Sequence, residues 1–317
     1  GGNSEAVHVD SSLGGLEITG GTYSSDVSAY TPDGYASIDA DGSFTIKPAT
    51  EPTDDSAAEV GGIYYKSVQN AVNAADDGAV VKLVKDTAET IVVSEGQNIV
   101  LDLNGKKLTG NTSAHTISVA GGTLSVKDST AESAPSVSSD YKVSYTSGAV
   151  EASSKNAVAV YGGGSFTLES GTLISTGNCG IYAGASDGGS GTAVINGGYI
   201  HAREFGVGVM MEGSSVTVNG GVIEADDNAV VAGNGTKGYG GTEIDINGGT
   251  LIGHIETGGY IACGIYHPQS GMLNISGGTI YADNGVGVLI RAGSANITGG
   301  EIIATGIGDG KVGDSTV

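Results

Sequence analysis

The sequence predicts an all-β fold, a right-handed parallel β-helix in which each coil carries three short strands. A short apolar strand, a polar residue, one or two glycines and a second apolar strand recur through the C-terminal half, as in AVINGGYIHA (193–202) and VTVNGGVIEA (216–225). Such a repeat is typical of a solenoid, because each copy can bury its apolar edge only against its neighbours. Apolar and polar residues alternate inside each copy, which indicates strands. Parallel crossover connections are nearly always right-handed.

The length of a coil follows from the glycine that precedes the second strand of each copy. These glycines are Gly171, Gly198, Gly221, Gly249, Gly278 and Gly300. The intervals between them are 27, 23, 28, 29 and 22 residues, so a coil takes about 22–29 residues. Glycine suits the sharp turn of a coil, because a positive φ costs it little.

The N-terminal part of the chain differs in pattern. Residues 1–47 are expected to form a strand and hairpin fragment that resembles the end of a repeat module, since LEITGGTYSS (16–25) carries the same core. The segment YASIDADGSFTIK (35–47) predicts a hairpin that turns at Asp41 and Gly42. Residues 48–60 are rich in proline, small residues and acids, which predicts a linker.

The β-helix unit is predicted for residues 61–317 and opens with a capping helix near 67–76. Ser67 is the expected N-cap, and Gly78 ends the helix. One apolar face is formed by Val68, Ala71, Val72 and Ala75. An amphipathic helix can cover the open strand edges at one end of a solenoid. Strands are expected next at 80–84, 91–93 and 99–103.

Residues 156–175 serve as the type coil for the rest, with strands expected at 158–161, 166–168 and 172–175. Like residues that stack from coil to coil are what a narrow parallel core requires. The inward stack of the first strand is expected to be Ile181, Val207, Val230, Ile265 and Val286. The inward stack of the third strand is expected to be Leu173, Ile200, Ile223, Leu251, Ile280 and Ile302.

The net charge excludes some classes of binding partner, and the spacing of the two cysteines bears on whether they form a disulfide. The formal net charge of −22 repels phosphate backbones and anionic membranes, so nucleic acid is not an expected partner. No apolar run is long enough to span a membrane. Cys179 and Cys263 fall three coils apart in this alignment, roughly 14 Å at the strand spacing, which is too far for a disulfide. We expect two buried free thiols.

Three segments resemble a known family. The stretches SVQNAVNAADDGAVVKLVKDT, IVLDLNGKKLTG and ITGGTYSSDVSAYTPDGY are similar to modules of large bacterial cell-surface and adhesin-like proteins. The helix followed by NGG-type coils resembles the pectate-lyase-like superfamily of right-handed parallel β-helices. The resemblance implies an extracellular module, at the cell surface or secreted. The shared residues are turn and core residues, which specify a fold better than an activity.

The resemblance leaves three functions open. The favoured one is a non-catalytic module that binds a glycan or a protein, as adhesins do. The alternative is a polysaccharide lyase or glycoside hydrolase, and a further alternative is a structural stalk. Related lyases hold Ca²⁺ with carboxylates on an outward strand face. The outward ladders of the first two strands carry no two carboxylates on adjacent coils, so we expect no metal site and no cofactor.

The third strand carries the candidate catalytic residues. Its outward ladder places His201 beside Glu224, and Arg203 lies beside Asp226. A carboxylate next to a histidine raises the histidine pKa, which acid–base chemistry can use. The simpler interpretation, which we favour, is a set of solvated ion pairs between neighbouring strands. An insertion at 254–262 adds His254 and Glu256 nearby.

The first strand carries the candidate ligand-binding residues. Its outward face is expected to present Tyr161, Tyr182, Met210 and Tyr266. Such a face can stack against sugar rings or meet a protein. The alternative is that the variable loops at 185–191 and 233–241 fold over it.

Overall fold

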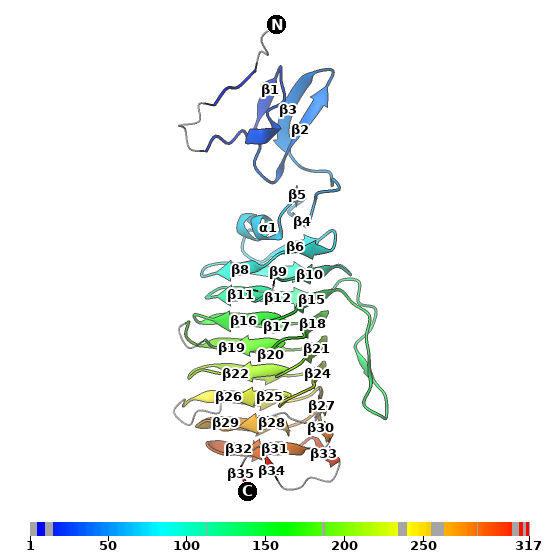
Figure 1. The fold of residues 1–317 in the computed structure, drawn as a ribbon, viewed down its shortest axis with the longest axis vertical. Helices are drawn as coiled ribbons and strands as arrows, with labels where there is room; N and C mark the ends of the chain where they lie inside the picture. Colours follow the sequence, from blue (N-terminus) through cyan, green and yellow to red (C-terminus); the bar gives the residue numbers. More distant parts are fainter. Residues whose placement is uncertain are drawn as a thin grey trace.

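The computed structural model describes residues 5–9, 15–111, 113–185, 188–233, 240–254, 263–283, 285–305, 311–312 and 315–316. Over these residues the chain is a parallel β-solenoid of about eight coils, preceded by one short helix and a small N-terminal unit (Figure 1). The coils stack along the long axis of the molecule, with the N-terminal unit at one end and the C-terminus at the other. The predicted fold class is therefore confirmed.

Three sheets form the walls of the solenoid, and the first is built from the first strand of each coil. Its strands are β8 (Ile91–Ser94), β11 (Ile117–Ala120), β16 (Val158–Tyr161), β19 (Ile181–Ala183), β22 (Val207–Val209), β25 (Val231–Gly233), β28 (Cys263–His267) and β31 (Val286–Ile290). Every pairing among them is parallel.

The second sheet contains the strand that precedes the glycine turn of each coil. Its parallel strands are β6 (Ala79–Leu83), β9 (Asn98–Asp102), β12 (Thr123–Lys127), β17 (Gly164–Leu168), β20 (Gly191–Ile195), β23 (Ser215–Val218), β26 (Thr242–Ile246), β29 (Gly271–Ile275) and β32 (Ser294–Ile297). At its N-terminal edge β4 (Ala58–Val60) pairs antiparallel with both β5 (Ile63–Tyr65) and β6. Residues 58–60, expected in the linker, are thus part of this sheet.

The third sheet follows the glycine turn. Its strands are β7 (Thr87–Ala88), β10 (Lys107–Thr109), β15 (Ala149–Ala152), β18 (Thr172–Ser175), β21 (Tyr199–Ala202), β24 (Val222–Ala225), β27 (Thr250–His254), β30 (Thr279–Asp283) and β33 (Glu301–Thr305). Two short strands near the C-terminus, β34 (Lys311–Val312) and β35 (Ser315–Thr316), pair antiparallel outside the three sheets.

A long insertion leaves the solenoid between β12 and β15. Residues 129–147, here called the strap, contain the antiparallel pair β13 (Ser136–Val137) and β14 (Val143–Ser144). The strap runs along the outside of the coils toward the C-terminal end (Figure 1). Its base is held by the buried Asp128, whose carboxylate accepts hydrogen bonds from the backbone N–H groups of Gly105 and Thr130 at 2.9 and 3.0 Å. The strap was not expected from the sequence.

The N-terminal unit is a three-stranded antiparallel sheet and not an additional coil. Its strand order is β1 (Gly21–Tyr23), β3 (Ser43–Pro48) and β2 (Tyr35–Ala40), and a 3₁₀ turn spans Ser28–Tyr30. The predicted hairpin is confirmed: Asp41 and Gly42 have φ values of 54° and 79° at its turn. The LEITGGTYSS segment contributes only β1, which pairs antiparallel with β3.

The helix α1 (Val68–Ala74) covers the N-terminal end of the core. Ser67 is its N-cap, and its hydroxyl accepts a hydrogen bond from the backbone N–H of Asn70. Val68, Ala71 and Val72 are fully buried, as the apolar face predicted. Glu89 completes this end of the helix, because its carboxylate accepts hydrogen bonds from the backbone N–H groups of Val68 and Gln69 at 2.7 and 3.1 Å.

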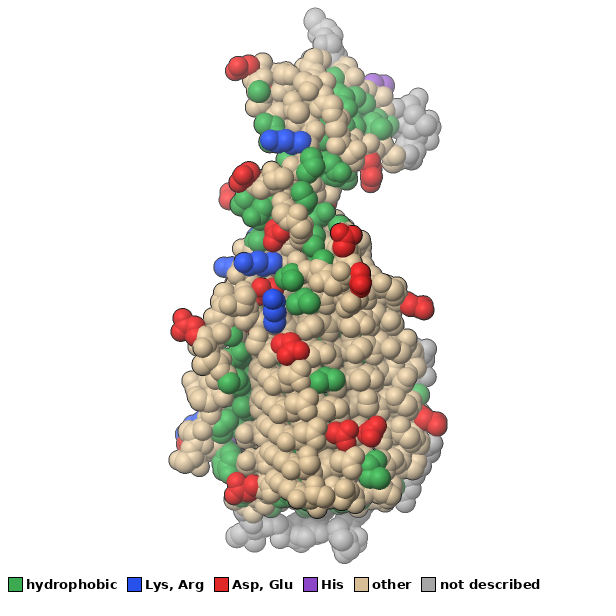
Figure 2. Space-filling view, turned by 180° about the vertical axis from the view of Figure 1, so that it is seen from behind, with side chains coloured by type: hydrophobic (Ala, Val, Ile, Leu, Met, Phe, Trp, Pro, Cys, Tyr) green, Lys and Arg blue, Asp and Glu red, His purple; other side chains and the backbone are tan. Residues whose placement is uncertain are grey.

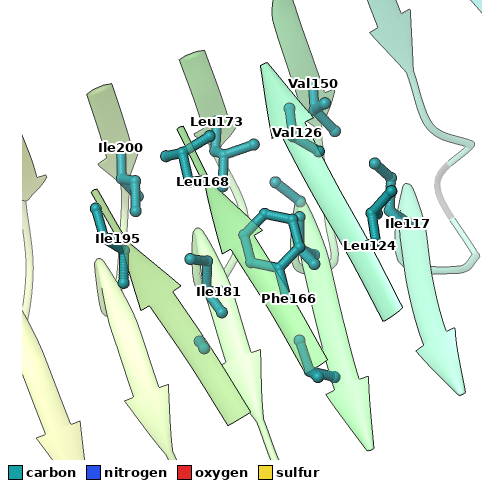
Figure 3. Close-up of a cluster of buried hydrophobic side chains, with 14 of the residues drawn as sticks. Ile117, Leu124, Val126, Val150, Phe166, Leu168, Leu173, Ile181, Ile195 and Ile200 are labelled. Carbon is teal, nitrogen blue, oxygen red and sulfur yellow. The ribbon is translucent and has the colours of Figure 1, made fainter. Parts of the chain in front are cut away.

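The core is one continuous stack of aliphatic side chains inside the three sheets (Figure 3). On the third sheet, Ile200 pairs with Ile223 and Ile223 with Leu251, in the predicted register. The whole predicted third-strand stack is confirmed by the pairings from Leu173 through Ile302. Phe166 and Leu173 belong to the middle of the stack and are fully buried.

The predicted register of the first sheet is wrong in its later coils. Val231, and not Val230, pairs with both Val207 and Ile265, and the next partner of Ile265 is Val288 in place of Val286. Residues 229–232 read Ala-Val-Val-Ala and all four are buried. An uninterrupted apolar run has no period of two, so it cannot show which residue points inward.

The glycine turns are held by a ladder of polar side chains. The six marker glycines all have positive φ, between 76° at Gly198 and 95° at Gly171. The asparagine that opens each NGG turn bonds to its neighbour on the adjacent coil: Asn219 donates to Asn196 at 2.9 Å, and Asn247 donates to Asn219 at 3.1 Å. The repeat therefore encodes both the turn geometry and the hydrogen bonds that tie successive turns together.

Candidate functional site

The candidate catalytic residues lie on the outer face of the third sheet, on β21 and β24 and in the turns that follow these strands. His201 pairs with Glu224 in the backbone register, as predicted, and Ile252 is the next residue in the ladder. The structure therefore brings the predicted residues onto one surface. The contacts among their side chains differ from the expected ones.

Glu224 is held by residues other than His201. One carboxylate oxygen accepts a hydrogen bond from the Tyr199 hydroxyl, and the other lies 2.8 Å from Nε2 of His254. Only 13% of the Glu224 side chain is exposed. His254 was expected nearby, but Tyr199 was missed, although it lies two residues before His201 and therefore on the same face of the strand. Glu256 lies outside the described residues.

His201 and Arg203 both pair farther along the neighbouring coil than predicted, His201 by two residues and Arg203 by one. Nε2 of His201 lies 3.0 Å from Oδ1 of Asp226, and Nε of Arg203 donates to Oδ2 of Asp227 at 2.9 Å. The predicted pairs were His201 with Glu224 and Arg203 with Asp226. Diagonal partners are reached because long side chains lean along the strand direction.

These contacts determine whether the pKa of each group is raised or lowered. The hydrogen bond to Asp226 raises the pKa of His201, and the hydrogen bond to Glu224 raises that of His254. Burial alone raises the pKa of Glu224, but hydrogen bonds from His254 and Tyr199 outweigh it, so the net shift is downward. Burial and the bond to Glu224 raise the pKa of Tyr199. The cluster is thus a set of charged pairs that stabilise one another.

A surface depression of about 380 Å³ adjoins this cluster. His201, Arg203, Asp226 and Asp227 line it, together with residues 174–176 on the preceding coil. The side chains of His201 and Asp226 are 38% and 40% exposed, so solvent reaches both members of that pair. The depression offers an imidazole, a guanidinium and two carboxylates to a ligand, all of them already paired.

The strap reaches the same face. The ring of Tyr141, in the connection between β13 and β14, stacks on Tyr281 of β30 with centroids 3.6 Å apart and planes inclined by 10°. Near the strap's other end, the Tyr145 hydroxyl accepts a hydrogen bond from the backbone N–H of Gly171 at 3.2 Å. Val222 and Ile252 point outward from the third sheet yet are 3% and 0% exposed. This sheet is therefore a partly covered face.

The candidate ligand-binding residues divide into two pairs. Tyr161 and Tyr182 are half-buried, whereas Met210 and Tyr266 are 8% and 2% exposed. Tyr266 belongs to a small apolar cluster with Ala232 and Cys263, and its hydroxyl accepts a hydrogen bond from Arg291 at 3.2 Å. The prediction of ligand binding at these four residues stays a prediction, and Tyr161 and Tyr182 are the accessible members.

The outward ladder of the first sheet also needs a correction that follows from the register. The predicted inward position of Val230 would put Val231 on the outward ladder, but Ala232 stands there between Gly208 and Tyr266. Leu289 then pairs with Tyr266. The loop around Gly188 passes so close to Tyr161 that a Cβ at Gly188 would lie 2.8 Å from the Tyr161 ring. The loop at Gly188 therefore packs over Tyr161, as expected from the alternative in which loops cover this face.

The remaining features concern cysteines, metals and membranes. Cys179 and Cys263 are buried thiols outside any disulfide, as predicted, and burial raises the pKa of both. In the described part of the chain, no group of three or more His, Cys, Asp or Glu side chains is arranged to hold a metal ion. The same residues include no helix that is long and apolar enough to cross a membrane.

Comparison of the chain with known protein families, with curated proteins and with solved structures gave no match.

Proposed function

We propose that the chain is a non-catalytic binding module of a bacterial cell-surface or secreted protein, with a glycan or a protein as its ligand. The environment of Glu224 argues against a catalytic role for this residue. A general acid or base must exchange a proton with its substrate. Both oxygens of Glu224 are engaged by Tyr199 and His254, and little of the side chain faces solvent.

Two accessible surfaces support a binding role. One is the depression beside His201 and Arg203, and the other is the half-buried pair Tyr161 and Tyr182. Tyr161, Tyr182 and His201 lie on strands of the solenoid, which holds their backbone in place before a ligand arrives and lowers the entropic cost of binding. The adhesin-like resemblance of the helix and of the LDLNGKKLTG segment supports the cell-surface setting.

A second candidate function is polysaccharide cleavage, as in a pectate-lyase-like enzyme. The observation that favours it is the solvent-accessible His201–Asp226 pair, because an imidazole whose pKa is raised by a carboxylate can act as a general acid. The third candidate is a stalk, which would bind nothing along its length.

Binding arrays separate these candidates. The full chain is applied to arrays of glycans and of purified extracellular proteins, beside the variants Tyr182→Ala and Arg203→Ala. The proposal predicts saturable binding that one of the two variants weakens by about tenfold or more. Absence of binding to every array member would favour the stalk. Release of new sugar ends from a polysaccharide would favour the enzyme.

A further inference from the structure

A cavity lies where the N-terminal unit meets the capping helix, and its walls are firmly joined. Asp33 of the N-terminal unit accepts hydrogen bonds from the backbone N–H groups of Lys66 and Ser67 at 2.7 and 3.0 Å. Its carboxylate also accepts one from the Asn70 side chain at 2.9 Å. The backbone N–H of Tyr64 donates to the Ala49 carbonyl at 2.8 Å. The molecule narrows at this junction (Figure 2).

The cavity has a volume of about 550 Å³, which falls within the range of roughly 300–1,000 Å³ for small-molecule sites. Tyr35 and Tyr64 line it and are half-buried. Ser37 also lines the cavity.

Charged side chains surround the cavity on its exposed side. Glu51 and Asp55 are both exposed and line the cavity together with Lys66. Lys66 lies 3.8 Å from Asp55, with both side chains mostly exposed, so this ion pair is weak and can open. With Asp33, the lining carries three carboxylates and one ammonium group. This balance disfavours an anionic ligand.

We propose that this cavity is a binding site for a neutral oligosaccharide. Tyrosine rings offer flat apolar faces to the C–H side of a sugar ring, and their hydroxyls supply polar contacts at the ring edge. Carboxylates such as Glu51 and Asp55 accept hydrogen bonds from sugar hydroxyls and form strong, charge-assisted bonds.

The site is separate from the surfaces on which the proposed function rests. Its walls come from the N-terminal unit, from residues 49–56, from β5 and from the start of α1, whereas Tyr161, Tyr182 and His201 lie on β16, β19 and β21. Ligand binding at the cavity is therefore independent of ligand binding at the coils, and each can be tested without the other. The solenoid face visible in Figure 2 is made largely of backbone and uncharged polar side chains.

Calorimetric titration of the full chain with cellotriose, chitotriose, maltotriose and mannotriose tests the proposal. At least one trisaccharide should bind with a measurable Kd. Tyr64→Ala should raise that Kd by about fivefold or more, because one aromatic stacking contact is lost. Glu51→Gln, at an exposed position that does not support the fold, should also raise it. Tyr281→Ala, at a half-buried tyrosine that lines neither the cavity nor the other two proposed surfaces, is the matched control and should leave it unchanged.

Three results would overturn the proposal. The first is that none of the four trisaccharides binds. The second is that a trisaccharide binds but is insensitive to both Tyr64→Ala and Glu51→Gln, with Tyr64→Phe included in case the alanine variant unfolds. The third is that a lysine-rich peptide binds at this cavity while the trisaccharides do not, since the acidic lining would then serve a cationic peptide.

Discussion

Replacement of Glu224 with glutamine tests how the third-sheet cluster is held together. The carboxylate is mostly buried and accepts hydrogen bonds from Tyr199 and His254. Glutamine keeps the size of the side chain but removes the charge, and it has one acceptor oxygen in place of two. A hydrogen bond to a charged group contributes about 1.5–3 kcal/mol, so we expect Glu224→Gln to lower the free energy of unfolding by about 1–3 kcal/mol.

The matched control is Asp226→Asn on the following turn. The Asp226 side chain is 40% exposed and pairs with the equally exposed His201, so its loss should cost less than about 1 kcal/mol. Urea unfolding followed by far-UV circular dichroism measures both variants against the parent chain. Equal small losses for the two variants would refute the reasoning, because Glu224 would then behave as an ordinary surface charge.

Three further predictions concern the core, pH and metals. Ile223 is fully buried, so Ile223→Ala should lower the free energy of unfolding in urea by about 2–5 kcal/mol. Ile302 is 41% exposed at the last coil, so Ile302→Ala should lower it clearly less. Similar losses for the two variants would contradict the strand register. Stability should fall as the pH rises from the ordinary histidine pKa of about 6.5 through the raised pKa values of His201 and His254, because both lose their protons there; a flat profile would contradict this. Excess EDTA should leave the thermal midpoint unchanged, and a fall that Ca²⁺ reverses would reveal a metal site.

The sign of the pH effect follows from the two classes of group. A histidine with a raised folded-state pKa contributes its full stabilisation below its ordinary pKa of about 6.5 and loses it as the pH rises through the raised value. Glu224 has a lowered pKa, so its contribution is present above the ordinary carboxyl range and is lost as the pH falls through the lowered value. Glu224→Gln should therefore flatten the alkaline loss that His254 causes.

Most of the fold could be predicted because the repeat constrains it at fixed points. The glycine turn sets where the second strand of a coil ends and the third begins, so the stack through Ile200 and Ile223 has the predicted register. The turn back to the first strand has no such marker and varies in length. Together with the apolar run at 229–232, this explains why Val230 was placed where Val231 lies.

The strap and the side-chain pairs could not be predicted for a different reason. The strap segment 129–147 is mostly polar and has no repeat, so its place along the third sheet depends on contacts with distant residues, such as the stack of Tyr141 on Tyr281 and the hydrogen bond between Tyr145 and Gly171. Strand register brings His201 next to Glu224, but the choice of partner is made by side-chain length and direction. As a result, His201 pairs with Asp226, and His254 pairs with Glu224.

The central claim is that the chain binds a ligand without chemical change, and one measurement tests it most directly. The full chain and Glu224→Gln are incubated with a panel of acidic and neutral polysaccharides, and both retained polysaccharide and newly released reducing or unsaturated ends are quantified. We predict retention of at least one polysaccharide with no new ends from either protein. Turnover by the parent chain that Glu224→Gln reduces by about a hundredfold, the low end of what a positioned acid or base contributes, would contradict the claim and identify an enzyme.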